Sequence, residues 1–504
     1  MKKSLTSRQS KEEKAIVIGG GIAGLLTARI LSDHYEEVII VERDELPKEP
    51  STRSGTPQAF HPHRVLPRGS MIMERFFPGY IEDLLEQGAH PTQNEKISLF
   101  TPYGSLKMFP PEKNASSSRA LLEWTFRQRV QKISNVRFLS KQEVTGLQTS
   151  ADHKQVTGVH IKERSEQKQE RTMTADLVVD TSGRSSKLIK WLESMGLEVP
   201  EPERLKVSLG YSTRYYRVPP HIKEKRGSII SEAQPARGIG TGMLGFMEDN
   251  IAQTLLFSAG GAHYPSTNPE EYEKELHELA TPMLAEVVKE LEPIGVPRGY
   301  RTPESVRQHF EQMEDWPSGL LVVGDAFCSF DPIHGQGMTV AAIEAEMLDI
   351  CLREQHHTSE LNFERKVLKR MQEAIEPAWW LSSVADLRWK GVEHVGAKPL
   401  KGVSFAQKYF DLYVKQAVKL ANEENNPGMF QQYFMMNALV LSPREIINPR
   451  MLNMLLMGDG SREEMQLLAE LGNVAEQQIQ ERLDELIPSF SLAFDEKAPT
   501  KTKA

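Results

Sequence analysis

The sequence predicts an α/β fold in three parts: a discontinuous α/β domain, a β-sheet domain and a helical C-terminal region. Two observations support this prediction. A buried-strand pattern, a glycine-rich loop and a helix pattern follow one another at residues 15–31, and the same order recurs at residues 320–348. From about residue 355 the pattern is helical. We expect the α/β domain to comprise residues 1–202 and 301–354, the sheet domain residues 203–300, and the helical region residues 355–504.

The composition indicates an ordinary soluble globular chain of 504 residues, with 39% hydrophobic and 26% charged residues. A formal net charge of −8 disfavours a nucleic-acid-binding surface. The two cysteines, Cys328 and Cys351, are too few for a disulfide scaffold and fit a reducing, cytoplasmic location. The N-terminal "MKKSLTSRQSKEEK" has no apolar segment, and no apolar run reaches the ~18 residues of a membrane span. We therefore expect no transmembrane segment and at most peripheral contact with a membrane.

The first strand–loop–helix unit is "AIVIGGGIAGLLTARIL". Its apolar run is typical of a strand buried on both faces. In the loop, Gly19 permits the tight turn, Gly21 lets the backbone approach a pyrophosphate, and Gly24 lets helix and strand pack closely. Ala23 lies between these glycines at the helix start, where free N–H groups and the helix dipole favour phosphate. The unit predicts dinucleotide binding.

A second apolar strand, "EVIIVER", leads to Glu42 and Arg43, with Glu42 about 20 residues after the glycines. A carboxylate at this position accepts hydrogen bonds from ribose hydroxyls and repels a 2′-phosphate. The unit therefore favours an unphosphorylated adenosine ribose, as in FAD or NAD.

The second unit, "GDAFCSFDPIHGQGM", suits the other end of such a molecule. Asp325, which follows Gly324 at the end of a strand, can accept hydrogen bonds from a polyol chain such as ribitol. Gly335 and Gly337 keep side chains away from the next helix start, so that its N–H groups face an electron-rich ring such as a flavin. Gln336 and Met338 belong to the same predicted flavin-facing segment.

Other patterns in the sequence give weaker evidence about function. "RGIGTGMLGF" has the glycine spacing but no preceding strand, so we interpret it as a turn or a close backbone approach beside a strand. His61 and His63 of "HPH" lack further ligand residues nearby, and we predict no metal site. "KVSLGYSTRYYRV" alternates like a half-buried strand. Methionines concentrated in "GMFQQYFMMNALVL" and "RMLNMLLMG" suit a lipophilic ligand channel or ordinary core packing. The tail "DEKAPTKTKA" has the composition of a disordered segment.

The paired glycine motifs resemble the fingerprint of FAD-dependent monooxygenases of the p-hydroxybenzoate hydroxylase type. A third segment, "ADLVVDTSGRSSKL", resembles the strand that lies between them in that superfamily, with Ser182 where Asp is usual and, in the last motif, Cys328 where His is common. The stretches "RSGTPQAFHPHRVLPRG", "SRALLEWTFRQRV" and "PAWWLSSVADLRW" are similar to the bacterial polyene epoxidases of polyether assembly. The resemblance implies a discontinuous Rossmann-like FAD-binding domain, a β-sheet substrate domain and a helical C-terminal region.

The resemblance also implies residue roles. Gly19, Gly21, Gly24 and Glu42 would bind the ADP half of FAD, Asp325 the ribitol, and residues 335–338 the isoalloxazine. Arg43 would neighbour the adenosine, Val144 would touch adenine through its backbone, Arg119 would contact the cofactor, and Arg53 would approach the flavin. For Arg53 and Arg119 a surface ion pair is the alternative.

By resemblance the activity is an FAD-dependent monooxygenation that uses NAD(P)H as a transient co-substrate and O₂. A C4a-hydroperoxyflavin would epoxidise or hydroxylate a lipophilic small molecule. The cofactor carries this chemistry, so no catalytic residue is nominated. The alternatives are a flavin-dependent reductase of isoprenoid double bonds and a non-catalytic flavin-binding protein. The W-x-W-x-I-P hallmark of flavin halogenases is absent from the sequence.

Overall fold

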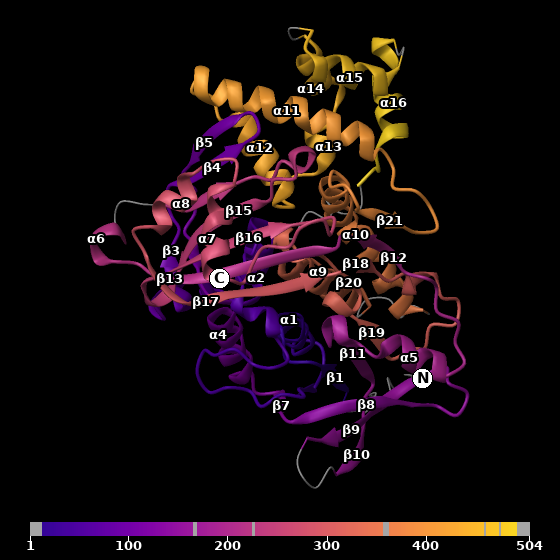
Figure 1. The fold of residues 1–504 in the computed structure, drawn as a ribbon. Coiled ribbons are helices and arrows are strands. Elements are labelled where there is room, and N and C mark those ends of the chain that lie inside the picture. Colours follow the sequence, from indigo (N-terminus) through magenta and orange to yellow (C-terminus); the bar gives the residue numbers. More distant parts are fainter. Residues whose placement is uncertain are drawn as a thin grey trace, which may run out of the picture.

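A five-stranded parallel sheet forms the centre of the α/β domain (Figure 1). The computed structural model describes residues 13–164, 169–223, 227–355, 362–457, 460–472 and 475–490. The strand order is β19 (Leu320–Val322), β11 (Leu177–Asp180), β1 (Lys14–Ile18), β2 (Glu37–Val41) and β7 (Val136–Leu139). The apolar strands β1 and β11 are buried along almost their whole length, because both faces of a parallel sheet are covered. Since β11 pairs with both β1 and β19, the sheet joins the chain segments around residues 14–180 and 320–322.

Helices from distant parts of the chain pack around this sheet. Helix α1 contacts α4 and α9, and α9 also contacts α2 and α10. Their bounds are α1 (Ile22–Leu31), α2 (Pro67–Phe76), α3 (Tyr80–Glu86), α4 (Arg119–Gln131), α5 (Leu188–Ser194), α9 (Gly337–Gln355) and α10 (Phe363–Asp386). A three-stranded antiparallel sheet of β8 (Gln142–Thr149), β9 (Val156–Glu163) and β10 (Glu170–Thr174) lies at the lower end of the molecule in Figure 1.

The second large sheet has seven strands. Their order is β17 (Glu292–Thr302), β13 (Leu209–Arg217), β16 (Ile251–Ser258), β15 (Thr241–Met247), β14 (Ile229–Ser231), β4 (Ile97–Thr101) and β5 (Gly104–Met108). Strands β4 and β5 come from a segment that we expected to belong wholly to the α/β domain. They join this sheet because β14 pairs in parallel with β4. The sheet domain is therefore not confined to residues 203–300. "RGIGTGMLGF" runs into β15, which pairs on both sides with neighbouring strands, so it is mostly strand rather than turn.

The expectation of a half-buried strand at residues 207–215 is wrong, because residues 209–214 of β13 are all buried. A different part of the protein packs against each face of this strand. Thr213 bonds His61 of the loop at residues 57–66, whereas Ser212 and Tyr216 lie on the side of α7 (Pro269–His277) and α8 (Met283–Val288). The alternating residue types of β13 therefore match two different protein environments, one on each face of the strand. Neither face is exposed to water over residues 209–214.

Two small sheets join these parts. One contains β20 (Cys328–Ser329), β18 (Ser305–Arg307), β12 (Glu203–Lys206) and β21 (Glu393–Val395), and the other contains β3 (His90–Pro91) and β6 (Ala115–Ser116). In the first, the Glu203 carboxylate lies 2.7 Å from His394 Nε2, 3.5 Å from His309 Nε2 and 3.7 Å from Arg307 Nη1. This ion cluster connects the α/β domain to the C-terminal region.

The C-terminal region is helical, as predicted, apart from β21. After α10 it contains α11 (Val403–Glu423), α12 (Gly428–Asn437), α13 (Pro443–Ile446), α14 (Pro449–Leu456), α15 (Arg462–Leu471) and α16 (Ile479–Leu486), at the top of Figure 1. Across the described ranges, no helix has the length and apolar character that crossing a bilayer requires. The tail predicted to be disordered lies outside the described residues.

The methionines of this region divide between core and surface. Met429 and Met436 of α12 are buried, whereas Met454 and Met457 near the end of α14 are exposed. None of them lines the cavity described below. Packing, rather than a channel, accounts for those that are buried.

Candidate functional site

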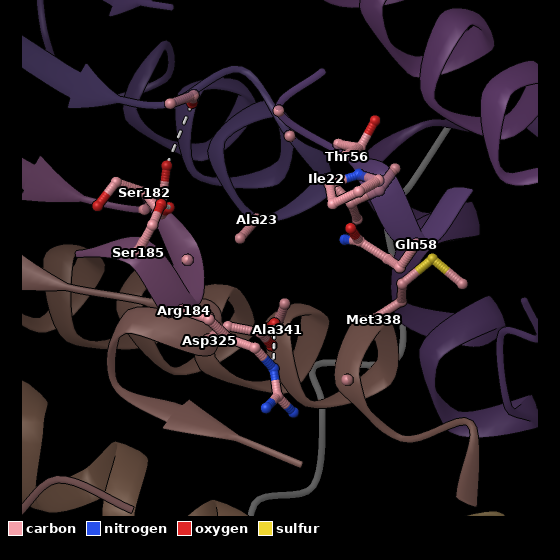
Figure 2. Close-up of a pocket in the computed structure, with 18 of the residues that line it drawn as sticks. Ile22, Ala23, Thr56, Gln58, Ser182, Arg184, Ser185, Asp325, Met338 and Ala341 are labelled. Atoms are coloured by element: carbon pink, nitrogen blue, oxygen red, sulfur yellow. Dashed lines mark hydrogen bonds and ion pairs between the residues drawn. The ribbon is translucent and has the colours of Figure 1, made fainter. Parts of the chain in front are cut away.

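The loops that follow β1, β2, β11 and β19 surround a cavity of about 420 Å³ (Figure 2). In open α/β sheets, ligands bind outside the carboxyl ends of the strands, where this cavity lies. Most of the residues predicted from the sequence share its wall. They are Gly19, Gly21, Ala23, Glu42, Arg43, Arg53, Arg119, Val144, Gly324, Asp325, Gly335, Gly337 and Met338.

The first glycine loop has the tight geometry that its sequence suggests. Gly19 has a φ of +106°, and a Cβ there would lie 2.9 Å from the carbonyl oxygen of Thr181. A Cβ at Gly24 would overlap the carbonyl oxygen of Gly19, so Gly24 serves helix packing and does not line the cavity. In the part of the chain that the structure describes, no side chain caps α1 at Gly21. The first N–H groups of α1 are therefore available to an anionic ligand.

Glu42 is almost fully buried and organises this loop. One carboxylate oxygen accepts the N–H of Gly20 at 2.8 Å and the other accepts the N–H of Asp44 at 2.9 Å. Each carboxylate oxygen can accept more than one hydrogen bond, so Glu42 keeps acceptor capacity towards the cavity. Its neighbour Arg43 is exposed, and the buried Val144 of β8 lies on the same cavity wall.

Arg53 belongs to a buried charge network rather than to a surface ion pair. Its guanidinium lies 2.8 Å from Glu123, 3.0 Å from Asp44 and 3.4 Å from Glu42, and all four side chains are buried. Burial opposes the charge, but Glu123 and Glu42 hold the pKa of Arg53 above its usual value. The network ties the loop at residues 53–55 to α4 and to the end of β2.

Arg119, at the start of α4, is also buried and is only partly satisfied. One guanidinium nitrogen lies 3.0 Å from Glu123, whereas Nη1 has no hydrogen-bond partner among the described residues. Burial lowers the pKa of Arg119, although an arginine remains charged. A buried donor without a partner on a cavity wall fits a polar or anionic ligand.

The second glycine segment meets the first across the cavity. Gly324 has a φ of +75°, and a Cβ there would lie 2.8 Å from the side chain of Ala23. Its N–H is held by the fully buried Glu344 of α9. Asp325 is partly exposed in the cavity, and its carboxylate lies 3.7 Å from the Arg184 guanidinium. Figure 2 marks this ion pair with a dashed line. The sequence did not suggest Arg184 or Glu344.

The turn before α9 brings backbone and an apolar side chain to the cavity. Gly335 has a φ of +65°, and Gly337, Met338 and Ala341 of α9 also line the wall. Figure 2 shows Met338 beside Gln58, across the hollow from Ser182. The side chain of Gln336, expected to face the flavin ring, is instead buried away from the cavity. The sequence spacing could not show that this side chain turns into the protein.

The segment between the two glycine motifs completes this edge. Thr181, Ser182 and Gly183 line the cavity, while Asp180 is fully buried. Asp180 accepts the Ser182 N–H at 2.9 Å and the Ser186 hydroxyl at 2.5 Å. Asp180 therefore shapes the turn and does not replace the carboxylate that Ser182 lacks.

The opposite wall comes from residues that sequence reasoning missed. Tyr211 and Thr302 lie on strands of the seven-stranded sheet, and His63 and Arg64 lie on the loop at residues 57–66. Burial lowers the pKa of His61 to about 3 and that of His63 to about 4, so both rings are neutral near pH 7. His61 is held by Thr213 at 2.9 Å, and His63 Nδ1 lies 2.8 Å from the His61 carbonyl. His63 lines the cavity, whereas His61 is buried and does not.

A different acid–histidine group lies beside the turn before α9. Potential ligand atoms of Asp331, His334 and Asp386 all lie within 4.8 Å of one another, the one such group among the described residues. Burial and the nearby Asp386 raise the pKa of Asp331 well above its usual value, whereas His334 lies 2.9 Å from Asp386.

The geometry fits one extended dinucleotide. The uncapped start of α1, the Glu42 carboxylate and the start of α9 all border one cavity, with the orphaned donor of Arg119 on its wall. Such a fold and site define a dinucleotide-binding flavoprotein whose second sheet closes the cavity. The chain belongs to the FAD-binding domain family, which residues 12–356 match.

The chain is also similar to individual known proteins. Protein Rv3254 of Mycobacterium tuberculosis is 29% identical over 398 residues, covering 77% of this chain and 82% of that protein. The flavin-dependent brominase Bmp2 has a similar fold, with a TM-score of 0.60, 14% identity and coverage of 84% of this chain and 92% of its own. So does PqsL, a probable FAD-dependent monooxygenase from Pseudomonas aeruginosa, with a TM-score of 0.55, 16% identity and coverage of 84% and 100%. These two structures show the shared fold alone. Membership of the FAD-binding domain family makes the protein an FAD-dependent enzyme, and NAD(P)H is the co-substrate typical of that family.

Proposed function

We propose that the protein is a monooxygenase that uses NAD(P)H and O₂ to epoxidise or hydroxylate a lipophilic small molecule. The observation that carries the proposal is a shared cavity. The flavin-facing turn at Gly335 and Met338 lies on the same hollow as Tyr211, Tyr300 and Phe330. A ring bound at that turn would therefore lie in one space with an aromatic and apolar substrate wall.

FAD supplies the redox chemistry when bound, accepting a hydride and activating O₂. The chain positions it and holds the substrate. Glu42 and the start of α1 bind the ADP half, Asp325 orients the ribitol, and the start of α9 faces the ring. The loop at residues 57–66 covers the reacting region, and its histidines are held neutral, which limits stray proton transfer to the ring. The similarity of three sequence stretches to polyene epoxidases supports an alkene as the oxygen acceptor.

The test uses the purified, FAD-loaded full chain and a panel of lipophilic alkenes. Consumption of NAD(P)H and O₂ that rises with substrate, together with a product that gains one oxygen atom, supports the proposal. Anaerobic saturation of the alkene would instead identify a reductase. A product that gains bromine or chlorine would identify a halogenase. Bound FAD that no compound turns over would indicate a non-catalytic flavin-binding protein.

A further inference from the structure

Arg64 lies next to the turn that begins α9. A Cβ at Gly335 would lie 3.6 Å from the Arg64 carbonyl oxygen and 3.7 Å from the Arg64 Cβ. Both residues line the cavity. The base of the Arg64 side chain therefore lies against the turn that begins α9, on the wall of the cavity.

The guanidinium of Arg64 has no counter-ion among the described residues. Its side chain is exposed to solvent in the hollow although protein atoms surround it densely. The ring of Phe434 in α12, 5.6 Å from the guanidinium carbon, is its one assigned partner in that part of the chain. Three other arginines of the wall, Arg53, Arg119 and Arg184, contact carboxylates. Arg43, beside Glu42 at the far end of the cavity from α9, resembles Arg64 in having no ion pair with a described residue.

The positive charge of Arg64 is not balanced by the described residues around it. The protein atoms crowded around Arg64 lower its pKa, because they displace part of the water that would solvate the charge, and the field of Glu95 only partly opposes this effect. Glu95 already accepts the N–H and the hydroxyl of Ser228, at 3.0 and 2.8 Å. The adjacent His63 is neutral near pH 7, since its pKa is lowered to about 4. The loop thus presents a single cation, and a planar guanidinium pairs best with a carboxylate.

Apolar side chains share the cavity with Arg64. Met338 and Phe330 line the same cavity, and the Phe434 ring contacts the guanidinium. We propose that the substrate is a lipophilic carboxylate whose charged end is bound by Arg64, so that its apolar chain extends past the turn at Gly335. This inference rests on the proposed function, since it assigns the substrate class of the same site.

The experiment titrates FAD-loaded full-length protein with matched pairs of compounds and follows the flavin absorbance. The pairs are linolenate, farnesoate and retinoate, each against its methyl ester. The variants are Arg64→Gln and Arg64→Lys. Arg137→Gln on β7 is the charge-matched control, because its exposed side chain pairs only with Glu37, at 2.9 Å, among the described residues.

We expect the wild type and Arg137→Gln to bind at least one carboxylate ten times or more tighter than its ester. Arg64→Gln should abolish this preference with FAD affinity unchanged, and Arg64→Lys should restore part of it. Equal affinities within every pair, or binding of no carboxylate, would overturn the inference. A fall in FAD affinity in Arg64→Gln would also overturn it, by assigning the arginine to the cofactor. Binding needs no turnover, so a failed oxygenation assay with an intact carboxylate preference would count against the proposed function alone.

Discussion

Replacing Glu42 with Gln tests how the first glycine loop is held and how FAD is bound. The carboxylate accepts two backbone N–H groups, from Gly20 at 2.8 Å and Asp44 at 2.9 Å, and its side chain is only 5% exposed. Glutamine keeps the shape but has one acceptor oxygen, and its NH₂ group faces a backbone donor. One of the two buried N–H groups must therefore lose its partner.

The cost follows from these contacts. A buried donor left without a partner costs about 1–3 kcal/mol. That loss should lower the thermal midpoint of the flavin-free protein by a few degrees. A charge-assisted hydrogen bond to the ribose contributes about 1.5–3 kcal/mol, so losing the charge should raise the Kd for FAD roughly 10- to 100-fold. Arg53 remains paired through Glu123 and Asp44, which limits collapse of the network.

The assay is fluorescence titration of FAD into flavin-free protein, with thermal unfolding measured on the same samples. Glu45→Gln is the matched control, because its side chain is 73% exposed and pairs only with Lys141, at 2.8 Å, among the described residues. Glu45→Gln should leave both quantities unchanged. If Glu42→Gln gave the same Kd and midpoint as Glu45→Gln, the ribose assignment and the loop-holding role would both be refuted.

Two further predictions follow from the structure. Gly24→Ala should lose FAD binding, because the new Cβ would overlap the Gly19 carbonyl oxygen, and it should destabilise the fold by about the several kcal/mol that overpacking costs. Gly245→Ala, in the other glycine-spaced stretch, has open space for its Cβ and should bind FAD normally. If FAD titration and thermal unfolding gave the same results for both variants, this contrast would be contradicted. Glu203→Gln should reduce stability more at pH 6 than at pH 9.5. Burial opposes the charge, but Glu203 and Glu311 raise the pKa of His309 to about 9 from its usual 6.5, so this stabilisation is complete below pH 6.5 and disappears as the pH rises through 9. The difference in thermal midpoint between the wild type and Glu203→Gln should therefore shrink as the pH rises from 6 to 9.5. A difference that stays constant across this range would contradict the prediction.

Much of the fold could be predicted because its signals are local. Apolar runs such as β1 identify strands buried on both faces, and the glycine spacing after β1 identifies a turn that no other residue fits. The helical C-terminal region follows from periodicity alone. β13 was misjudged because its alternation separates two covered faces, and the sequence does not say what covers a strand. Strands β4 and β5 could not be placed because their partner β14 is far along the chain.

The candidate site shows the same division. The sequence by itself determined which backbone can approach a phosphate, because glycine spacing, strand and helix are adjacent in the chain. Only the tertiary structure decided that the Gln336 side chain is buried away from the cavity and that Arg53 is surrounded by three carboxylates. The same holds for Arg64, which contacts no carboxylate among the described residues. The physical reason is that the partners of a charged or polar side chain are chosen by packing between distant segments. Residue type and local spacing determine what kind of group such a side chain can bind. They do not determine which groups lie next to it in the folded protein.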